Sequence, residues 1–350
     1  MHLRRRRIPA HERTTSQRML ALIGGGWDIV TWAYLLLALV VAISRPIGGA
    51  PPPVLQGLQA GFPLVMMPLV VVLLGAVLSR RWVQAAATLL LTATAWFAVS
   101  PALGRDQPPF WAKTGDRLRI AEANVYYRST RPTDAAAAVF AHDADLVVVS
   151  ELNPLFVAAA TQLGVEERYP YRLLDPVEPV GQGSGPGGLG LYSKYPFDDI
   201  ERVGRDGAPF VRIVLPRGRA IRVLPVHVPS PSAASRVALW SSELSRLGRL
   251  VESADEPVLL VGDFNASRWQ PSFGALLKRN LTDAHESVGR GLSRSWTSSF
   301  PVFRLDHALF SRELAATSVT DFDVPGSDHR GFVADLVAQP VPDTSPDSVG

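Results

Sequence analysis

Three long apolar runs within the first hundred residues constrain this chain more than any other feature of its sequence. They cover residues 27–43, 62–78 and 82–99. Each run is near the lower end of the length that spans a bilayer as a helix, and each is apolar all round rather than along one face. The first two have strongly apolar cores, whereas the third is rich in Ala and Thr. We therefore predict an α-helical transmembrane anchor of about three helices over residues 27–99.

The distribution of positive charge predicts how this anchor is oriented. Residues 1–26 contain six Arg and one Glu, and Arg80 and Arg81 lie in the short connection between the second and third runs. Such charges mark the cytoplasmic ends of spans, so we expect a basic cytoplasmic N-terminus and a cytoplasmic Arg80–Arg81 turn. Three spans would make this a multi-pass protein of the cell membrane, with everything after residue 100 outside the cytoplasm. If the third run does not span, that part lies inside.

Composition excludes several kinds of site. The chain has no cysteine, which rules out disulfides, thiolate zinc sites and cysteine nucleophiles. The net charge is +3, but residues 1–26 carry +5 and residues 27–99 carry +2, so residues 100–350 carry −4. Proteins that grip duplex DNA usually present a basic surface. The acidic C-terminal part is therefore unlike a general DNA-binding protein.

The pattern of apolar and polar residues changes after the anchor. Residues 100–116 combine Pro, Gly and charge without periodicity, and we interpret them as a linker. Residues 117–338 alternate short apolar runs, typical of buried strands, with helical stretches, which predicts a layered α/β domain. The glycine-rich stretch 181–190 is expected to be a loop, and residues 339–350 a disordered tail.

Polar side chains recur at the ends of the strand-like runs, where a folded sheet would bring them to one edge. They are carboxylates, carboxamides and imidazoles, without thiols, and comprise Asn124, Glu151, His227, Asp263, Asn265, Asp306, Asp328 and His329. Oxygen-rich sets of this kind suit a hard cation such as Mg²⁺ or Mn²⁺. Imidazole paired with carboxylate also suits proton transfer.

In their order and approximate spacing, these residues resemble the endonuclease/exonuclease/phosphatase superfamily, which includes DNase I-like nucleases, inositol-polyphosphate 5-phosphatases and neutral sphingomyelinases. The segments at 262–265 (GDFN) and 327–329 (SDH) carry the most specific part of the resemblance. The match covers residues 117–338. It implies a DNase I-like, two-sheet, four-layer α/β sandwich with the active site at one end of the sheets.

The resemblance also implies a role for each residue. Glu151 is expected to be the principal ligand of Mg²⁺ or Mn²⁺, with Asn124 close by. Asp328 either joins this metal site or orients His329. One departure concerns position 126, where many nucleases of the family have an acid and this chain has Tyr126, which makes a second metal less expected.

The remaining expected roles concern water and phosphate. His329, oriented by Asp306, is expected to act as general base or as a hydrogen-bond donor in the transition state. Asp263 is expected to position or activate the attacking water, so Asp263 and His329 are both candidate bases. Asn265 and His227 are expected to hold the phosphate oxygens. Arg268 and Trp269, just after GDFN, are predicted to line the substrate cleft.

The sequence thus predicts a membrane-anchored, divalent-metal-dependent phosphoesterase that cleaves a phosphodiester or phosphomonoester. A nucleic acid and a phospholipid or phosphoinositide headgroup both remain candidate substrates. The lipid bilayer is the expected partner of the N-terminal helices, and no feature of the sequence indicates a protein partner. The alternative is a non-catalytic membrane receptor or scaffold that retains the fold, which loss of Glu151, Asp263 or His329 would favour; all three are present.

Overall fold

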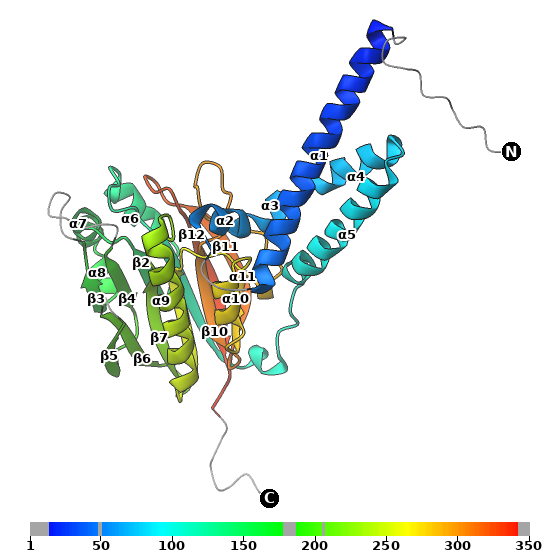
Figure 1. Cartoon of the computed structure of the whole chain (residues 1–350). Coiled ribbons are helices and arrows are strands. Elements are labelled where there is room, and N and C mark those ends of the chain that lie inside the picture. The colour runs from blue at the N-terminus through cyan, green and yellow to red at the C-terminus, as the bar shows by residue number, and fades with distance from the viewer. Residues whose placement is uncertain (1–13, 48–50, 178–186, 205–206, 342–350) are drawn as a thin grey trace, which may run out of the picture. The chain divides into compact units, whose positions relative to one another are not determined.

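The computed structural model describes residues 14–47, 51–177, 187–204 and 207–341 (Figure 1). Within the chain, Met1–Pro46 and Phe62–Ala98 form one compact unit, and Ile47–Gly61 and Val99–Gly350 form a second. The start of the basic N-terminus (1–13), most of the glycine-rich loop (178–186) and most of the expected tail (342–350) lie outside the described residues.

The first unit is helical and consists of α1 (Thr15–Ile47), α3 (Phe62–Met66), α4 (Leu69–Leu78) and α5 (Trp82–Val99). Two stretches, Gly25–Ile47 and Trp82–Leu103, are long and apolar enough to cross a membrane by composition. The segment Phe62–Leu78 passes the same test only together with α2 (Pro53–Ala60), from which it is bent by 80°.

The second apolar run, rather than the third, is the one that does not form a single continuous helix. The interruption lies in the second run, where α3 ends at Met66 and α4 begins at Leu69. Pro68 at this break has no backbone N–H to donate and its ring crowds the preceding turn, which ends or kinks a helix. The Ala- and Thr-rich third run is a continuous helix, α5.

Within the first unit, the candidate span Gly25–Ile47 of α1 begins beside the start of α5, and the two helices run in the same direction (Figure 1). The carboxylate of Asp28 lies 2.9 Å from Nε of Arg81 and also accepts a hydrogen bond of 2.9 Å from Gln84 Nε2. Towards the other end of α1, the guanidinium of Arg45 stacks on the ring of Phe62. Asp28 is therefore partnered by groups at the start of α5.

The second unit contains two six-stranded sheets. The order in the first is β11-β12-β1-β2-β4-β3, and in the second β5-β6-β7-β8-β10-β9. The strands of the first sheet are β1 (Asp116–Asn124), β2 (Leu146–Ser150), β3 (Tyr171–Asp175), β4 (Leu189–Ser193), β11 (Leu314–Asp323) and β12 (Arg330–Ala338). Those of the second are β5 (Asp199–Val203), β6 (Ala208–Val214), β7 (Ala220–His227), β8 (Val258–Asp263), β9 (Leu281–Asp283) and β10 (Asp306–Ser311).

Helices cover the outer face of each sheet. The first sheet packs against α6 (Pro132–Phe140), α7 (Pro154–Gln162) and α8 (Val165–Arg168), and the second against α9 (Ala234–Ser253) and α10 (Pro271–Leu277), with α11 (Ala284–Ser287) beside β10 and β11. A central core formed by both sheets contains Ile120, Val148, Val223 and Leu259. The predicted two-sheet, four-layer α/β sandwich is confirmed.

Residues 100–116 contain two short 3₁₀ turns, η2 (Ser100–Leu103) and η3 (Phe110–Lys113), where the sequence indicated a linker without regular structure. They are attached to the sandwich: Ala102 is buried, and the backbone N–H of Asp106 donates to the carbonyl of Ser287 at 2.8 Å. The second unit also includes Ile47–Gly61, a segment that the sequence analysis grouped with the anchor.

Candidate active site

Strand register brings the polar strand ends to one edge of the sandwich. β1 and β2 are parallel, so Asn124 pairs in register with Ser150, directly before Glu151. β7 and β8 are also parallel and end together at His227 and Asp263. The remaining two strands run the other way and begin at this edge. Asp306 at the start of β10 pairs with Asp263, and His329 directly precedes β12.

The backbone at this edge adopts conformations that side chains rarely take. Glu151 has a φ of 53° and Asn265 a φ of 45°. Such outliers persist only where the surrounding structure holds them, and they concentrate at functional sites. Gly262 of the GDFN segment has a φ of 146°, and a Cβ there would lie 1.9 Å from the carbonyl oxygen of Val226. The close parallel pairing that delivers His227 and Asp263 together therefore requires glycine at position 262.

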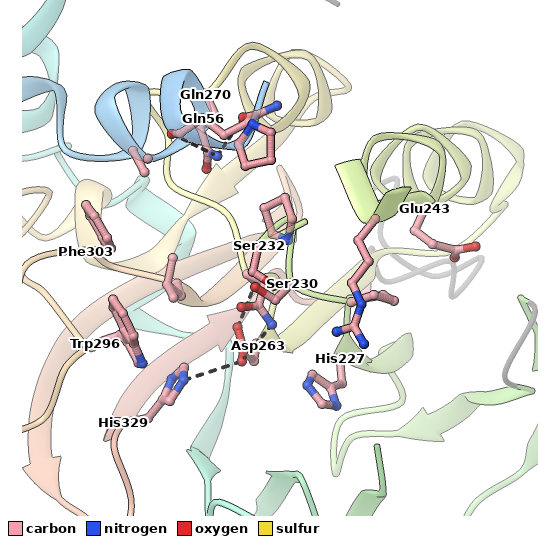
Figure 2. Close-up of a pocket in the computed structure, with 18 of the residues that line it drawn as sticks. Gln56, His227, Ser230, Ser232, Glu243, Asp263, Gln270, Trp296, Phe303 and His329 are labelled. Atoms are coloured by element: carbon pink, nitrogen blue, oxygen red, sulfur yellow. Dashed lines mark hydrogen bonds and ion pairs between the residues drawn. The ribbon is translucent and has the colours of Figure 1, made fainter. Parts of the chain in front are cut away.

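Three buried groups form the centre of the site. His329 Nδ1 lies 2.8 Å from Asp306 Oδ2. His329 Nε2 lies 3.8 Å from Asp263 Oδ2, a contact that Figure 2 marks with a dashed line. Relative exposure is 0% for Asp306, 1% for Asp263 and 4% for His329. The imidazole thus lies between two carboxylates from neighbouring strands, where each group changes the proton affinity of the others.

Burial and neighbouring charges shift the pKa values of His329 and Asp263 to different ranges. Burial alone would lower the pKa of His329, but the carboxylates of Asp306 and Asp263 raise it to about 10. Burial, followed by the Asp306 carboxylate, raises the pKa of Asp263 to about 7. The imidazole is therefore a cationic donor at neutral pH, whereas Asp263 gains and loses a proton in the range useful to a general base.

The Asp263, Asp306 and His329 side chains also lie close enough together to surround a cation, with one ligand atom of each within 4.8 Å of the others. The 2.8 Å contact between His329 Nδ1 and Asp306 Oδ2 already satisfies the imidazole with a carboxylate partner. We therefore interpret this trio as a proton-handling group.

A separate set of oxygen atoms fits a hard cation. Glu151 accepts hydrogen bonds from Asn124 Nδ2 at 3.2 Å and from the Tyr127 backbone N–H at 3.0 Å, and Asp328 accepts one from Trp296 Nε1 at 3.0 Å. Burial raises the pKa of Glu151, and Asp328 adds to this effect. Two neighbouring carboxylates in a buried setting favour a divalent cation with oxygen ligands.

Asn124, which was expected to lie beside Glu151 at the metal site, has both polar atoms of its side chain in hydrogen bonds. Asn124 is fully buried, and its Nδ2 bridges Glu151 and Asp263, with 3.1 Å to the latter. Its Oδ1 accepts the backbone N–H of Tyr126 at 3.0 Å. Asn124 therefore joins the two halves of the site.

The two residues expected to hold phosphate oxygens differ in their availability. Burial, followed by the charge of His329, lowers the pKa of His227 to about 4, so its ring is neutral. His227 lines the pocket, and its ring nitrogens have no hydrogen-bond partner among the described residues. Asn265 donates its side-chain amide to Val228 O at 3.0 Å and to Asp263 Oδ2 at 3.2 Å. Asn265 thus holds the Asp263 carboxylate rather than offering free donors.

The structure does not bring Arg268 and Trp269 to the substrate cleft. Arg268 makes an ion pair with Glu286 and stacks on the ring of Trp269, and Trp269 is buried. Glu286 also binds Arg304, which in turn contacts Asp283 at 3.0 Å. Arg268 therefore belongs to a buried charge network beside the site, because its guanidinium has carboxylate partners there.

Sequence reasoning missed two residues that shape the site. Ser327 Oγ donates to the carbonyl of Asn124 at 2.7 Å and accepts the backbone N–H of His329 at 3.0 Å. Glu122, on β1, is fully buried, and burial together with Asp306 and Asp263 raises its pKa well above the ordinary value. A glutamate inside the apolar run of β1 was visible in the sequence, whereas its proximity to β8 and β10 required the fold.

A pocket of about 760 Å³ opens over this edge. It is lined by Glu151, His227, Asp263, Asn265, Asp328 and His329, together with residues of the loop after β7, of α9, of α2 and of the 296–305 segment. Figure 2 shows His227, Asp263 and His329 facing the same space. The predicted catalytic residues, other than buried Asp306, thus share one cavity of the size that binds small ligands.

The sequence model of the Endonuclease/Exonuclease/phosphatase family matches residues 121–329. The chain belongs to this family. Members of the family with phosphoester substrates support a phosphoesterase-type hydrolase activity for a site of this composition.

Individual relatives agree with this assignment. The uncharacterized protein YbhP of Escherichia coli strain K12 is 30% identical over 162 residues, which cover 43% of this chain and 62% of YbhP. The endonuclease/exonuclease/phosphatase from Beutenbergia cavernae superimposes with a TM-score of 0.51 at 18% identity, over 64% of this chain and 72% of that one. A humanized D. rerio TDP2 gives 0.51 at 16% identity, over 63% and 98%. At these identities the two structures show the shared fold.

Proposed function

We propose that this chain is a membrane-anchored, divalent-cation-dependent phosphoesterase whose catalytic domain lies outside the cytoplasm. The observation that carries the proposal is the convergence of Glu151, Asp263 and His329 from three separate strand ends on one pocket. A non-catalytic scaffold would have no need for a buried imidazole between two carboxylates, an arrangement that costs stability unless it is used.

The proposed reaction is hydrolysis of a phosphate ester. Water adds to phosphorus while the bond from phosphorus to the alcohol oxygen breaks, so the ester and one water become a phosphate and an alcohol. Asp263 takes the proton of the water, in keeping with its raised pKa. His329, held as a cation by Asp306, donates to an oxygen on which negative charge develops.

The other residues bind and orient. His227 offers a neutral imidazole to a non-bridging phosphate oxygen. Asn265 and Asn124 hold the Asp263 carboxylate by hydrogen bonds of 3.2 Å and 3.1 Å. A divalent cation such as Mg²⁺ or Mn²⁺, held by Glu151 and Asp328, would supply positive charge against the phosphate oxygens.

Two facts about the chain support this location of the catalytic domain. Asp28, near the start of the candidate span Gly25–Ile47, meets Arg81 at the start of α5, and the two candidate spans run in the same direction. The chain must then return between them through residues 62–78. Ile47–Gly61 and Val99–Gly350 belong to one compact unit, so they lie on the same side of a membrane, opposite the basic N-terminus.

The proposal is tested with the full chain purified in detergent micelles and a soluble diester, bis-p-nitrophenyl phosphate. We expect turnover with Mg²⁺ or Mn²⁺, none with a chelator, and none in the variants Glu151→Ala and His329→Ala at unchanged thermal stability. Near-wild-type rates in either variant, with folding intact, would exclude the assignment.

A further inference from the structure

Helix α2 forms part of the wall of the active-site pocket, although it lies between two apolar segments in the sequence. Pro53, Gln56, Gly57 and Ala60, all from α2, line the same pocket as Asp263 and His329. Figure 2 shows Gln56 and Gln270 on the opposite side of the pocket from His329. A loop between membrane segments thus completes a site whose chemistry comes from the sandwich.

Buried polar contacts fix α2 to the sandwich. Gln270 Nε2 donates to Gln56 Oε1 at 2.9 Å, and Ser267 Oγ donates to the carbonyl of Ala60 at 3.1 Å. Gln56, Ser267 and Gln270 are each at most 3% exposed. At the end of α2, Gly61 approaches the ring of Phe303 so closely that a Cβ would lie 3.1 Å from it. Contacts of this kind mark a built interface, because buried polar groups are retained when they are paired.

One donor in this interface is left over. Gln56 is 2% exposed, yet its Nε2 has no hydrogen-bond partner, while its Oε1 is bound by Gln270. A buried amide N–H without a partner costs free energy unless a ligand supplies the acceptor. Because Gln56 lines the pocket, that acceptor is expected to belong to the substrate.

A cation without a partner lines the same pocket. The guanidinium of Arg236, on α9, forms no ion pair or hydrogen bond among the described residues. It is the single Lys or Arg among the described residues that line the cavity. Arg236 and Gln56 together offer donors to headgroup oxygens outside the reacting phosphate centre, which His227 and His329 face.

Chain connectivity ties this wall to the membrane segments at both ends. Ala60 lines the pocket, and Phe62, two residues later, begins the apolar segment Phe62–Leu78. Two steps of about 3.8 Å separate their Cα atoms at most by about 8 Å. On the other side, the candidate span Gly25–Ile47 ends six residues before Pro53. The pocket wall is therefore joined through a few residues to segments apolar enough to enter a membrane, which favours a substrate that the membrane itself supplies.

We infer that α2 is the substrate-selecting wall of the site and that the substrate is the headgroup phosphate of an anionic phospholipid in the same membrane. The inference rests on the proposed phosphoesterase activity. A nucleic acid strand is the less suitable substrate, because binding its backbone requires a row of cations. This pocket is lined by one arginine and by the carboxylates of Glu151, Glu243, Asp263 and Asp328.

The test compares three substrates with the full chain in detergent micelles and Mg²⁺. They are phosphatidylglycerol in mixed micelles, followed by release of its labelled glycerol headgroup, bis-p-nitrophenyl phosphate, and a single-stranded DNA oligonucleotide. We expect the ratio of kcat/KM for phosphatidylglycerol to that for the soluble diester to fall at least about tenfold in both test variants. Gln56→Glu replaces the unpaired N–H donor by an oxygen that cannot donate, and Arg236→Gln removes a charged donor. Gln56→Glu keeps the oxygen that accepts from Gln270, and turnover of the soluble diester reports that the fold is intact.

The matched control is Arg249→Gln, which removes an exposed arginine of the same helix that does not line the pocket, and it should leave the ratio unchanged. An unchanged ratio in both test variants, or cleavage of the oligonucleotide but not the lipid, would overturn the inference while the phosphoesterase stands. Absence of turnover with every substrate would instead remove the phosphoesterase and the inference with it.

Discussion

The Nδ1 atom of His329 lies 2.8 Å from Oδ2 of Asp306. Both side chains are buried, with Asp306 at the start of β10 and His329 directly before β12. This contact holds the imidazole in its protonated form, because the carboxylate offsets the effect of burial and helps raise the pKa of His329 to about 10. The proposed reaction requires the protonated form, so this pair determines the alkaline limit of activity.

Replacing Asp306 by Asn should move the alkaline limit of activity. Without the carboxylate, the pKa of His329 falls toward or below its ordinary value of about 6.5, and the donor is lost as pH rises past that value. We expect kcat/KM of Asp306→Asn to decrease at least about tenfold between pH 6 and pH 8.5, whereas the wild type loses little over the same range. The measurement is the pH profile of kcat/KM with the soluble diester.

The control for this prediction is Asp323→Asn, which removes a carboxylate that is 85% exposed and pairs with Arg330. Its pH profile should follow that of the wild type. Parallel profiles for Asp306→Asn and the wild type would mean that Asp306 does not control the protonation of His329.

A double-mutant cycle should show that Asp263 and His329 act as a unit. They lie 3.8 Å apart, and in the proposed reaction Asp263 takes the proton of the water while His329 donates to an oxygen on which negative charge develops in the same step. We expect Asp263→Asn and His329→Gln each to lower kcat about 10²–10⁴-fold, and the double variant to lose little more than the worse single variant. Losses that multiply would indicate two independent roles. His142→Gln, which removes an imidazole away from the pocket, should retain full activity.

Much of this site could be predicted because each of its residues ends or begins an apolar strand. Asn124, Glu151, His227 and Asp263 follow strands whose parallel pairing brings their ends together, and the fold class follows from the same alternation. The side-chain partners could not be predicted in this way. Nothing in the sequence indicates that Glu286 forms an ion pair with the guanidinium of Arg268 and so keeps Arg268 from the cleft.

The contribution of α2 was beyond sequence reasoning for a different reason. Gln56 lies between two apolar runs, more than sixty residues before the first strand end of the site, and local patterning assigns it to the anchor. Only its long-range contact with Gln270 reveals its place in the pocket wall. The break at Pro68 was visible in the sequence, but the apolar character of the run outweighed it in the prediction of a span.

The role of Glu151 as a cation ligand predicts a specific defect. Glu151→Gln keeps the size of the side chain and one acceptor oxygen for either Asn124 Nδ2 or the Tyr127 N–H, but it removes the negative charge. We expect the Mg²⁺ concentration for half-maximal activity to rise about 10–100-fold, with partial recovery of kcat at high Mg²⁺. His329→Gln should lower kcat without shifting this concentration. Equal Mg²⁺ dependence in Glu151→Gln and the wild type would remove Glu151 from the metal site.

The buried charge network beside the site predicts a loss of stability. Asp283 contacts Arg304 Nη1 at 3.0 Å and His307 Nδ1 at 2.6 Å, and all three side chains are buried. Burial alone would raise the pKa of Asp283, but Arg304 and His307 hold it well below its ordinary range. The carboxylate therefore stabilises the fold above the unfolded pKa of about 3.9, and this contribution is lost as pH falls below that value.

Asp283→Asn removes one of the two carboxylate partners of the buried Arg304 guanidinium and leaves it only Glu286. Removing one member of a buried pair costs about 3–5 kcal/mol, which lowers Tm by roughly 6–20 °C for a domain of this size. The control is Glu313→Gln, whose partner Arg312 is 89% exposed and whose loss should cost less than about 1 kcal/mol. Both are measured by thermal unfolding in detergent at pH 7. Equal Tm values for the two variants would mean that the network does not stabilise the fold.

The topology of the chain can be tested with unusual clarity because it contains no cysteine. Single cysteines are introduced at three exposed positions: Val54 on α2, Ser79 between α4 and α5, and Ser253 at the end of α9. The common unit formed by Ile47–Gly61 and Val99–Gly350 requires Val54 and Ser253 to lie on one side of the membrane. The neighbouring Arg80 and Arg81 place Ser79 on the cytoplasmic side.

We expect a membrane-impermeant maleimide to label Val54→Cys and Ser253→Cys in intact cells, and Ser79→Cys only after the membrane is permeabilised. Val54→Cys and Ser253→Cys must behave alike, because α2 packs on the sandwich through Gln56 and Ala60. Labelling of Val54→Cys but not Ser253→Cys would show that residues 62–98 cross an odd number of times. The pocket wall formed by α2 would then be impossible in the membrane, whatever the activity of the sandwich.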